Sequence, residues 1–277
     1  MPNVQLDWQQ STLLAVALAA AALVLDRWPR GRGLAPFARE AGVIAALYSV
    51  WMLAATLAQT HTAGAFSRGR WIYRVQRRWH LPSEQVLQNA LLRHPDLART
   101  ANLYYATMHF TALFAFLLWV FVRHRDRYRT VRTTVVGFTL LSLVIQFIPV
   151  APPRLYPNLG FVDVAQMFGQ SVYSFGLGAD ELSAMPSVHV GWAVLIGTAV
   201  VLISRSPWRW VVVLHPVLTV LVVTATANHW WADGIVAAAL VVLVAAAQWL
   251  YSRRPQRAAT TALEPVPADL VGADRAA

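Results

Sequence analysis

Two short stretches of the sequence combine residue types that can bind an anion and move a proton. The first, AMPSVH at residues 184–189, opens an apolar run. Proline at the first helical position presets φ and gives up no needed N–H, so we expect a helix to begin at Pro186. Free N–H groups at a helix start, with the Ser187 hydroxyl, form an anion site, and His189 beside it can protonate a departing oxygen. This stretch therefore predicts an anion site with an adjacent acid.

The second stretch, NHWWAD at residues 228–233, predicts a nucleophilic histidine. Asn228 can cap the following helix, which is a common position for asparagine. His229 and Asp233 are four residues apart, so they share one helix face. A carboxylate on one imidazole nitrogen fixes the tautomer and leaves the other nitrogen nucleophilic. Either stretch alone is weak, because a lone histidine in an apolar segment is more often structural.

Composition places both stretches in a membrane protein. Of 277 residues, 57% are hydrophobic and 13% charged, against about 25% charged in soluble domains. Cysteine is absent, which excludes disulfides and thiolate metal sites. The net charge of +10 comes from arginine without lysine, and in a membrane protein it indicates orientation and attraction to anionic lipid. We expect no nucleic-acid binding.

Seven apolar segments predict an all-α, polytopic membrane helical bundle. A helix rises 1.5 Å per residue, so about 20 residues cross the bilayer. Arginines follow the first segment and none precedes it, which predicts a retained span instead of a cleaved signal. The seven segments lie at residues 11–26, 35–59, 101–122, 131–149, 187–204, 208–227 and 232–251.

The distribution of arginine predicts the orientation of the chain. One set of connections is rich in arginine, whereas the short connections on the other side hold only Arg154. The positive-inside rule then places the N-terminus outside and the C-terminus in the cytoplasm. Both chemical stretches then fall on the outer face. A charged Asp233 near the membrane interior costs about 2.5–3.5 kcal/mol, and a partner such as His229 would explain why an aspartate is placed there.

Residues 60–100 depart from this charge rule, because they lie outside yet carry seven arginines. Within residues 71–80, apolar and aromatic side chains alternate with arginines at helical spacing. That pattern favours an interfacial amphipathic insertion whose arginine stems reach lipid headgroups, with a simple surface anchor as the alternative. The tail at residues 253–277 is rich in Ala, Pro and acidic residues and is expected to be a disordered cytoplasmic tail.

The order of the two motifs resembles the type 2 phosphatidic acid phosphatase superfamily, whose second motif reads Pro-Ser-Gly-His and whose third ends His-x-x-x-Asp. The stretches AMPSVHVGWA and TANHWWAD resemble the branch that contains inositol phosphorylceramide synthase. The resemblance covers residues 35–252 and implies a six-helix phosphatidic acid phosphatase-like core. Residues 1–34 are then an additional N-terminal span with its cytoplasmic loop.

The resemblance also implies roles. His229 would be the nucleophile that forms a phosphohistidine, Asp233 its orienting partner, and His189 the acid for the leaving group. Ser187 would contact the phosphate, with Asn228 in the same substrate-binding set. No metal and no other cofactor is implied.

Three departures from the family pattern stand out. Val188 replaces the Gly of the second motif, and the Ser-Arg that opens the third motif is replaced by Val222 and Val223. The lysine-containing first motif has no match. Arg154 is our candidate for the phosphate clamp, because phosphoryl transfer needs cationic donors for the phosphate oxygens. The alternative is an interfacial arginine beside a Pro-rich turn.

Several further residues have two readings. Tyr105 and His109 lie near one face of the third span and could line a substrate groove or make an interhelical hydrogen bond. Arg39 and Glu40 are expected to form a local ion pair. Glu181, in the outer loop, could touch a headgroup or be solvated.

These observations predict an integral membrane lipid phosphatase or phosphotransferase with its site at the outer face. The substrate would be a phospholipid or an isoprenyl phosphate, and the phosphoryl or phospho-headgroup, including phosphoinositol, would pass to water or to a lipid alcohol. A transporter or channel with a polar pathway is the alternative. Against it, the polar groups gather at one face instead of the midplane. The oligomeric state stays open.

Overall fold

The described part of the chain is a bundle of helices joined by short connections. The computed structural model describes residues 6–58, 62–171 and 181–253. Within these ranges there is no β-strand, and an isolated bridge joins Val150 to Ser183. The elements are α1 (Trp8–Arg27), α2 (Ala35–Ala58), α3 (Ala65–Arg78), α4 (Glu84–Leu92), α5 (Pro95–Arg123), α6 (Arg125–Gln146), η1 (Pro153–Leu155), η2 (Pro157–Leu159), α7 (Val164–Met167), α8 (Val188–Ile203), η3 (Pro207–Val213), α9 (Leu214–Ala225) and α10 (Trp231–Ser252). The all-α fold is confirmed.

Long helices coincide with the seven predicted spans. Five of them are long and apolar enough to cross a membrane, namely α1, α2, α5, η3 with α9, and α10. Helix α8 is apolar but has 16 residues, and the first eight residues of α6 include four arginines and an aspartate. The chain is an integral membrane protein.

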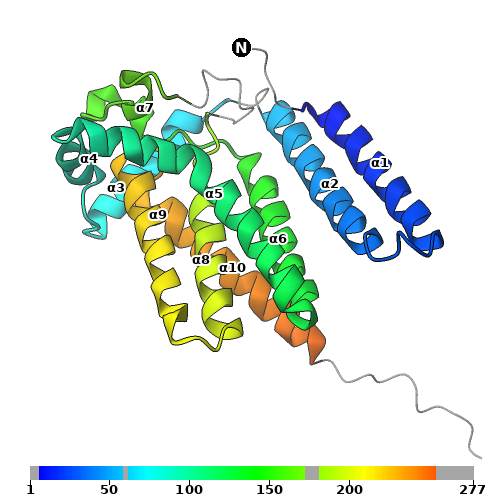
Figure 1. Cartoon of the computed structure of the whole chain (residues 1–277). Coiled ribbons are helices and arrows are strands. Elements are labelled where there is room, and N and C mark those ends of the chain that lie inside the picture. The colour runs from blue at the N-terminus through cyan, green and yellow to red at the C-terminus, as the bar shows by residue number, and fades with distance from the viewer. Residues whose placement is uncertain (1–5, 59–61, 172–180, 254–277) are drawn as a thin grey trace, which may run out of the picture.

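The core lies among α5, α6, α8, α9 and α10 (Figure 1). Trp192 on α8 donates its indole N–H to Thr139 Oγ1 on α6 at 3.0 Å. Gly191 allows these two helices to approach closely, because a Cβ there would lie 2.5 Å from Cε1 and 2.6 Å from Cε2 of Phe138. A second cluster at one end of the bundle joins α3 to Tyr156 and Trp230.

Helices α1 and α2 form a hairpin that contacts the bundle through α2 (Figure 1). Glu40 accepts hydrogen bonds from Arg132 at 2.5 Å and from the Tyr128 hydroxyl at 2.9 Å, both on α6. The expected local pair between Arg39 and Glu40 is therefore wrong. Arg39 instead lies 3.9 Å from the exposed Asp26. The half-buried Glu40 is used to attach the hairpin.

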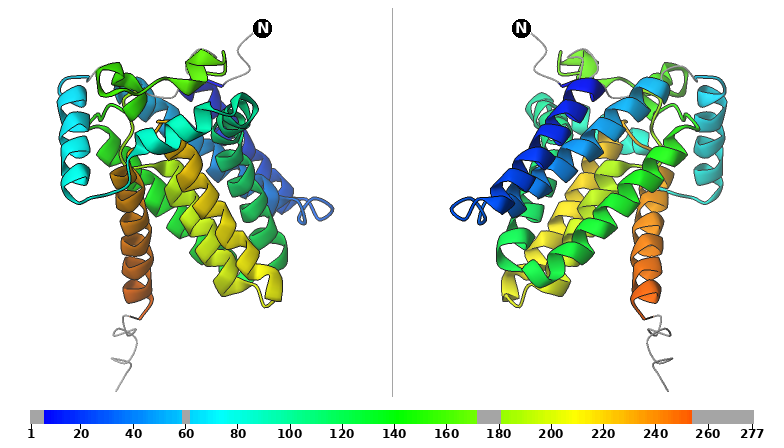
Figure 2. Two further views of the ribbon diagram at one scale, coloured as in Figure 1. Left: turned by 90° about the vertical axis from the view of Figure 1, so that its left-hand side faces the viewer. Right: turned by 90° about the vertical axis from the view of Figure 1, so that its right-hand side faces the viewer.

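The two ends of the bundle differ in what they carry. Helices α3, α4 and α7 lie at one end, and the α1–α2, α5–α6 and α8–α9 connections lie at the other (Figures 1 and 2). The arginine-rich connections therefore gather at the end away from the 60–100 segment. That segment contains two helices, α3 and α4, and its place in the membrane interface stays a prediction. The predicted tail lies almost wholly outside the described residues.

Candidate active site

A backbone hydrogen bond joins the two sequence stretches directly. The Ser187 N–H donates to the Asp233 carbonyl oxygen at 3.2 Å. Both residues are fully buried. The starts of α8 and α10 therefore lie together at the end of the bundle that carries α3 and α4, as the pairing of the motifs predicted.

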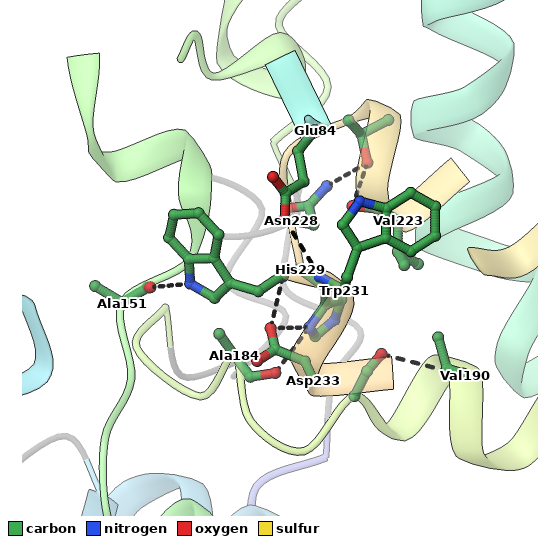
Figure 3. Close-up of polar contacts among 12 residues, drawn as sticks. Glu84, Ala151, Ala184, Val190, Val223, Asn228, His229, Trp231 and Asp233 are labelled. Atoms are coloured by element: carbon green, nitrogen blue, oxygen red, sulfur yellow. Dashed lines mark hydrogen bonds and ion pairs between the residues drawn. The ribbon is translucent and has the colours of Figure 1, made fainter. Parts of the chain in front are cut away.

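His229 is held by two acceptors on one ring nitrogen (Figure 3). Its Nδ1 lies 2.8 Å from the Ala184 carbonyl oxygen and 3.4 Å from Asp233 Oδ2. Because both neighbours only accept, Nδ1 carries the proton and the neutral ring leaves Nε2 unprotonated. His229 lies in the turn before α10 instead of on the helix, and Ala227, at φ 57°, shapes that turn.

His189 lies close to His229 and inside a cluster of rings. The two imidazole centroids are 5.6 Å apart. Tyr105 on α5 stacks on His189 at 4.3 Å, and His109 lies 4.1 Å from the same ring. In the part of the chain that is described, the buried Nε2 atoms of His189 and His229 have no hydrogen-bond partner. Each imidazole therefore has one buried ring nitrogen that no described protein group engages.

Tyr105 and His109 thus pack against His189, and Tyr105 also lies near His229, with ring centroids 6.3 Å apart. His109 Nδ1 contacts the Tyr105 carbonyl oxygen at 3.1 Å, one turn earlier in the same helix. That contact lies within α5, and whether the two side chains line a substrate groove stays a prediction.

The caps of the two helices differ from expectation. Helix α8 begins at Val188 with Ser187 as its N-cap, so Pro186 precedes the helix instead of opening it. The Ser187 oxygen accepts a long hydrogen bond from the Val190 N–H at 3.4 Å. At α10 it is Asp233 that accepts from the Trp230 N–H, at 2.8 Å, because its carboxylate reaches back from the third helical position.

Asn228 does not cap α10, which corrects the prediction. The asparagine is buried, and its side chain donates to Thr226 Oγ1 at 2.9 Å. This bond braces the turn that carries His229 and directs the amide toward the protein. Asn228 therefore stabilises the turn from inside. Among the described contacts, none joins its side chain to either histidine.

Arg154 lies beside the site with two carboxylates on its guanidinium. Its backbone N–H donates to the Ala227 carbonyl oxygen at 2.9 Å, two residues before His229. The buried side chain lies 3.2 Å from Asp163 and 3.4 Å from Glu181. Glu181 is thus half-exposed and also paired with Arg154. The Arg154 side chain is buried between two carboxylates, unlike an arginine that merely faces the membrane interface. The carboxylates hold the guanidinium in place but compete with any anion for it.

Glu84 on α4 is a buried carboxylate that the sequence analysis did not single out. Its side chain accepts from the Gln76 amide and, at 3.4 Å, from the Trp231 N–H at the start of α10. Burial raises the pKa of Glu84, and the nearby Asp233 raises it further. Two carboxylates, Glu84 and Asp233, therefore accept from successive N–H groups at the start of α10, where the helix dipole favours negative charge (Figure 3).

No sequence signal separates Glu84 from the other polar residues of the 60–100 segment, since it stands in no motif and no charge pattern marks it as buried. Across residues 6–58, 62–171 and 181–253, no three His, Cys, Asp or Glu side chains group as a metal site would require. The described groups are instead the imidazoles of His189 and His229, the Asp233 carboxylate on His229 and the Arg154 guanidinium nearby.

Comparison with known proteins agrees with this geometry at the level of the family. No curated protein and no solved structure matches the chain. The model of the PAP2 superfamily matches residues 70–250, which include the 60–100 segment from α3 onward, both histidine motifs and α10. Because the match spans more than half of the sequence, the chain belongs to the PAP2 superfamily, whose members are generally phosphatases or phosphotransferases.

Proposed function

We propose that this protein is a lipid phosphatase or phosphotransferase that works through a phosphohistidine at His229. The observation that carries the proposal is the placement of Nδ1 between the Ala184 carbonyl and the Asp233 carboxylate. A proton fixed on Nδ1 leaves the Nε2 lone pair available for attack on phosphorus. The protein supplies this nucleophile itself, so the proposed reaction needs no metal.

In the first step, His229 Nε2 forms a bond to phosphorus and the bond from phosphorus to the lipid oxygen breaks. His189, 5.6 Å away between ring centroids, gives a proton to that departing oxygen. In the second step, water or a lipid hydroxyl attacks the phosphohistidine while His189 takes its proton. The P–N bond breaks and both imidazoles return to their starting states.

The surrounding residues fit subsidiary roles in this scheme. Arg154 would exchange at least one of its carboxylate contacts, with Asp163 or Glu181, for the phosphate oxygens, and Ser187 at the start of α8 would contact the same group. Tyr105 and His109 pack on His189 and would fix its ring while lining the approach from α5. Asn228 would act through the turn it braces.

The direction of the site relative to the membrane follows from the charge distribution. The arginine-rich connections lie at the end of the bundle opposite α3, α4 and α7. By the positive-inside rule that end is cytoplasmic, so the histidines would face outside and act on the outer leaflet. Substrates with a phosphate at the membrane surface, such as phosphatidate or isoprenyl phosphates, suit this placement. A phosphoinositol transfer to a second lipid would follow the same two steps, with a phosphohistidine intermediate that still carries the inositol.

The first test is release of phosphate or transfer of a headgroup from a panel of phospholipids and isoprenyl phosphates. Wild type, His229→Ala and His124→Ala are compared, since His124 lies at the other end of α5. We expect the His229 variant to lose on the order of 10³-fold or more in rate, the His124 variant to keep its activity, and EDTA to have no effect. Full activity of His229→Ala would refute the mechanism. Solute flux across liposomes that contain the protein, unchanged by His229→Ala, would favour a transporter.

A further inference from the structure

Helix α3 has two unlike faces, and the inner one is fixed against the wall of the site. Ala65, Gly69, Ile72 and Gln76 recur at helical spacing and are buried. At Gly69 a Cβ would lie 2.6 Å from the Ala151 carbonyl oxygen and would also meet the Tyr156 hydroxyl. The helix therefore lies in close contact with the segment that leads to Arg154. Figure 2 shows α3, in cyan, on the outer flank of the bundle in both views.

The outer face of α3 is basic without compensating acid. Arg70, Arg74, Arg77 and Arg78 are exposed, and the helix sequence AFSRGRWIYRVQRR contains no Asp or Glu. We call these four residues the α3 basic face. Among the described residues, none of the four takes part in an ion pair. Four guanidinium groups are thus held together at one side of a rigid helix.

Aromatic side chains border this face. Phe66 and Trp71 on α3 and Trp79, just after it, are all more than half exposed. Arginine stems with neighbouring tryptophans are typical of segments at the headgroup level, where the rings are partly apolar and the guanidinium groups bind phosphate oxygens. The protein spans a membrane and α3 lies at one end of its bundle, so the charged partner next to this face is the bilayer surface.

We propose that the α3 basic face binds the headgroups of anionic phospholipids and concentrates them beside the site. The attraction is electrostatic and does not depend on the reaction catalysed. Each arginine near an anionic leaflet favours such a lipid about five-fold, the factor equivalent to about 1 kcal/mol. Because Gly69 fixes the inner face, the lipids gathered on the outer face stay at a constant place relative to Trp230 and the His229 turn.

The absence of cysteine in the chain allows a direct test. A donor fluorophore is placed on Ser67→Cys, an exposed position of α3, in the full chain reconstituted in nanodiscs. Energy transfer is measured to acceptor-labelled phosphatidylglycerol and, separately, to acceptor-labelled phosphatidylcholine. The measurement is repeated with Arg74→Gln, Arg77→Gln and Arg78→Gln combined.

A matched control removes the same charge from the opposite end, with Arg123→Gln, Arg127→Gln and Arg129→Gln combined, all exposed in the structure. We expect several-fold more transfer to phosphatidylglycerol in wild type and in this control, and a much smaller preference in the α3 variant, which keeps Arg70 alone of the four arginines. Equal transfer in wild type, or a preference that the α3 substitutions do not reduce, would overturn the proposal.

A salt titration of wild type gives a second measurement that needs no variant. Raising the ionic strength from about 0.15 M to about 1 M shortens the Debye length from about 8 Å to about 3 Å, so the preference should disappear. A preference that is independent of salt would also contradict the proposal. Neither readout uses catalysis, so failure here leaves the proposed phosphoryl transfer to its own test.

Discussion

Replacing Gly191 by alanine should destabilise the bundle, because α8 and α6 leave no room for the added methyl group. The new Cβ would overlap Cζ of the fully buried Phe138 ring and would lie 2.5 Å and 2.6 Å from its Cε1 and Cε2. Ordinary carbon contacts lie at about 3.5–4.0 Å, so the ring or the helix must move by more than about 1 Å. Overpacking of this kind costs roughly 1–3 kcal/mol.

Gly234 on α10 provides the matched control. A Cβ there would meet Val190 at 3.5–3.9 Å, which is ordinary van der Waals contact. Both substitutions are Gly→Ala within a helix, so the gain in helix propensity, about 1 kcal/mol, is common to both and cancels in the comparison. The difference between the two variants therefore measures the clash with Phe138.

The assay is the apparent thermal midpoint of the purified variants in one detergent. A difference of roughly 1–3 kcal/mol corresponds to about 2–12 °C for a chain of this size, with Gly191→Ala the lower. A double variant that adds Phe138→Leu should recover part of the loss by making room for the methyl group. Equal midpoints for the two alanine variants would show that the α6–α8 contact is looser than the structure describes and would refute the reasoning.

Three further predictions address the site and the hairpin. Burial raises the pKa of Glu84, so the contribution of this carboxyl to stability is fully present below the ordinary pKa of 4.5 and is lost as the pH rises through the raised pKa. The thermal midpoint of Glu84→Gln should therefore rise relative to that of wild type toward neutral pH. A difference between the two midpoints that stays constant with pH would contradict this. Glu40→Ala, which removes a partly buried pair at 2.5 Å, should cost roughly 1–3 kcal/mol in denaturation experiments, whereas Asp26→Ala, with an exposed partner at 3.9 Å, should change little. Asp233→Asn should lower kcat on the order of 10²–10⁴-fold with KM little changed, because an amide cannot hold the same His229 tautomer; an unchanged kcat would exclude the orienting role.

The spans could be predicted because run length and hydropathy are properties of contiguous sequence. Each apolar segment became a helix close to its predicted bounds, including the first one, Trp8–Arg27. The partner of Glu40 could not be predicted in this way, since Arg132 is far along the chain and the adjacent Arg39 offered a nearer choice. Long-range pairing depends on how helices pack, and an apolar period alone does not specify that.

The closeness of His189 and His229 could be predicted, because both motifs were expected at helix ends on the same face of one bundle. The helix caps were not, because Asn228 and Asp233 both can cap α10 and only the geometry of the turn decides in favour of Asp233. The burial of Glu84 and the carboxylates around Arg154 also depend on how the segments between the spans fold. In a sequence these residues look like other polar residues near a membrane surface.

The bond between the Ser187 N–H and the Asp233 carbonyl is made entirely by the main chain. No side chain takes part in it, so a substitution in either motif that preserves the backbone leaves both its donor and its acceptor. The link between the starts of α8 and α10 therefore requires a backbone conformation and no particular side chain. The residues around these two helix starts can change in size or charge without removing either partner of that bond.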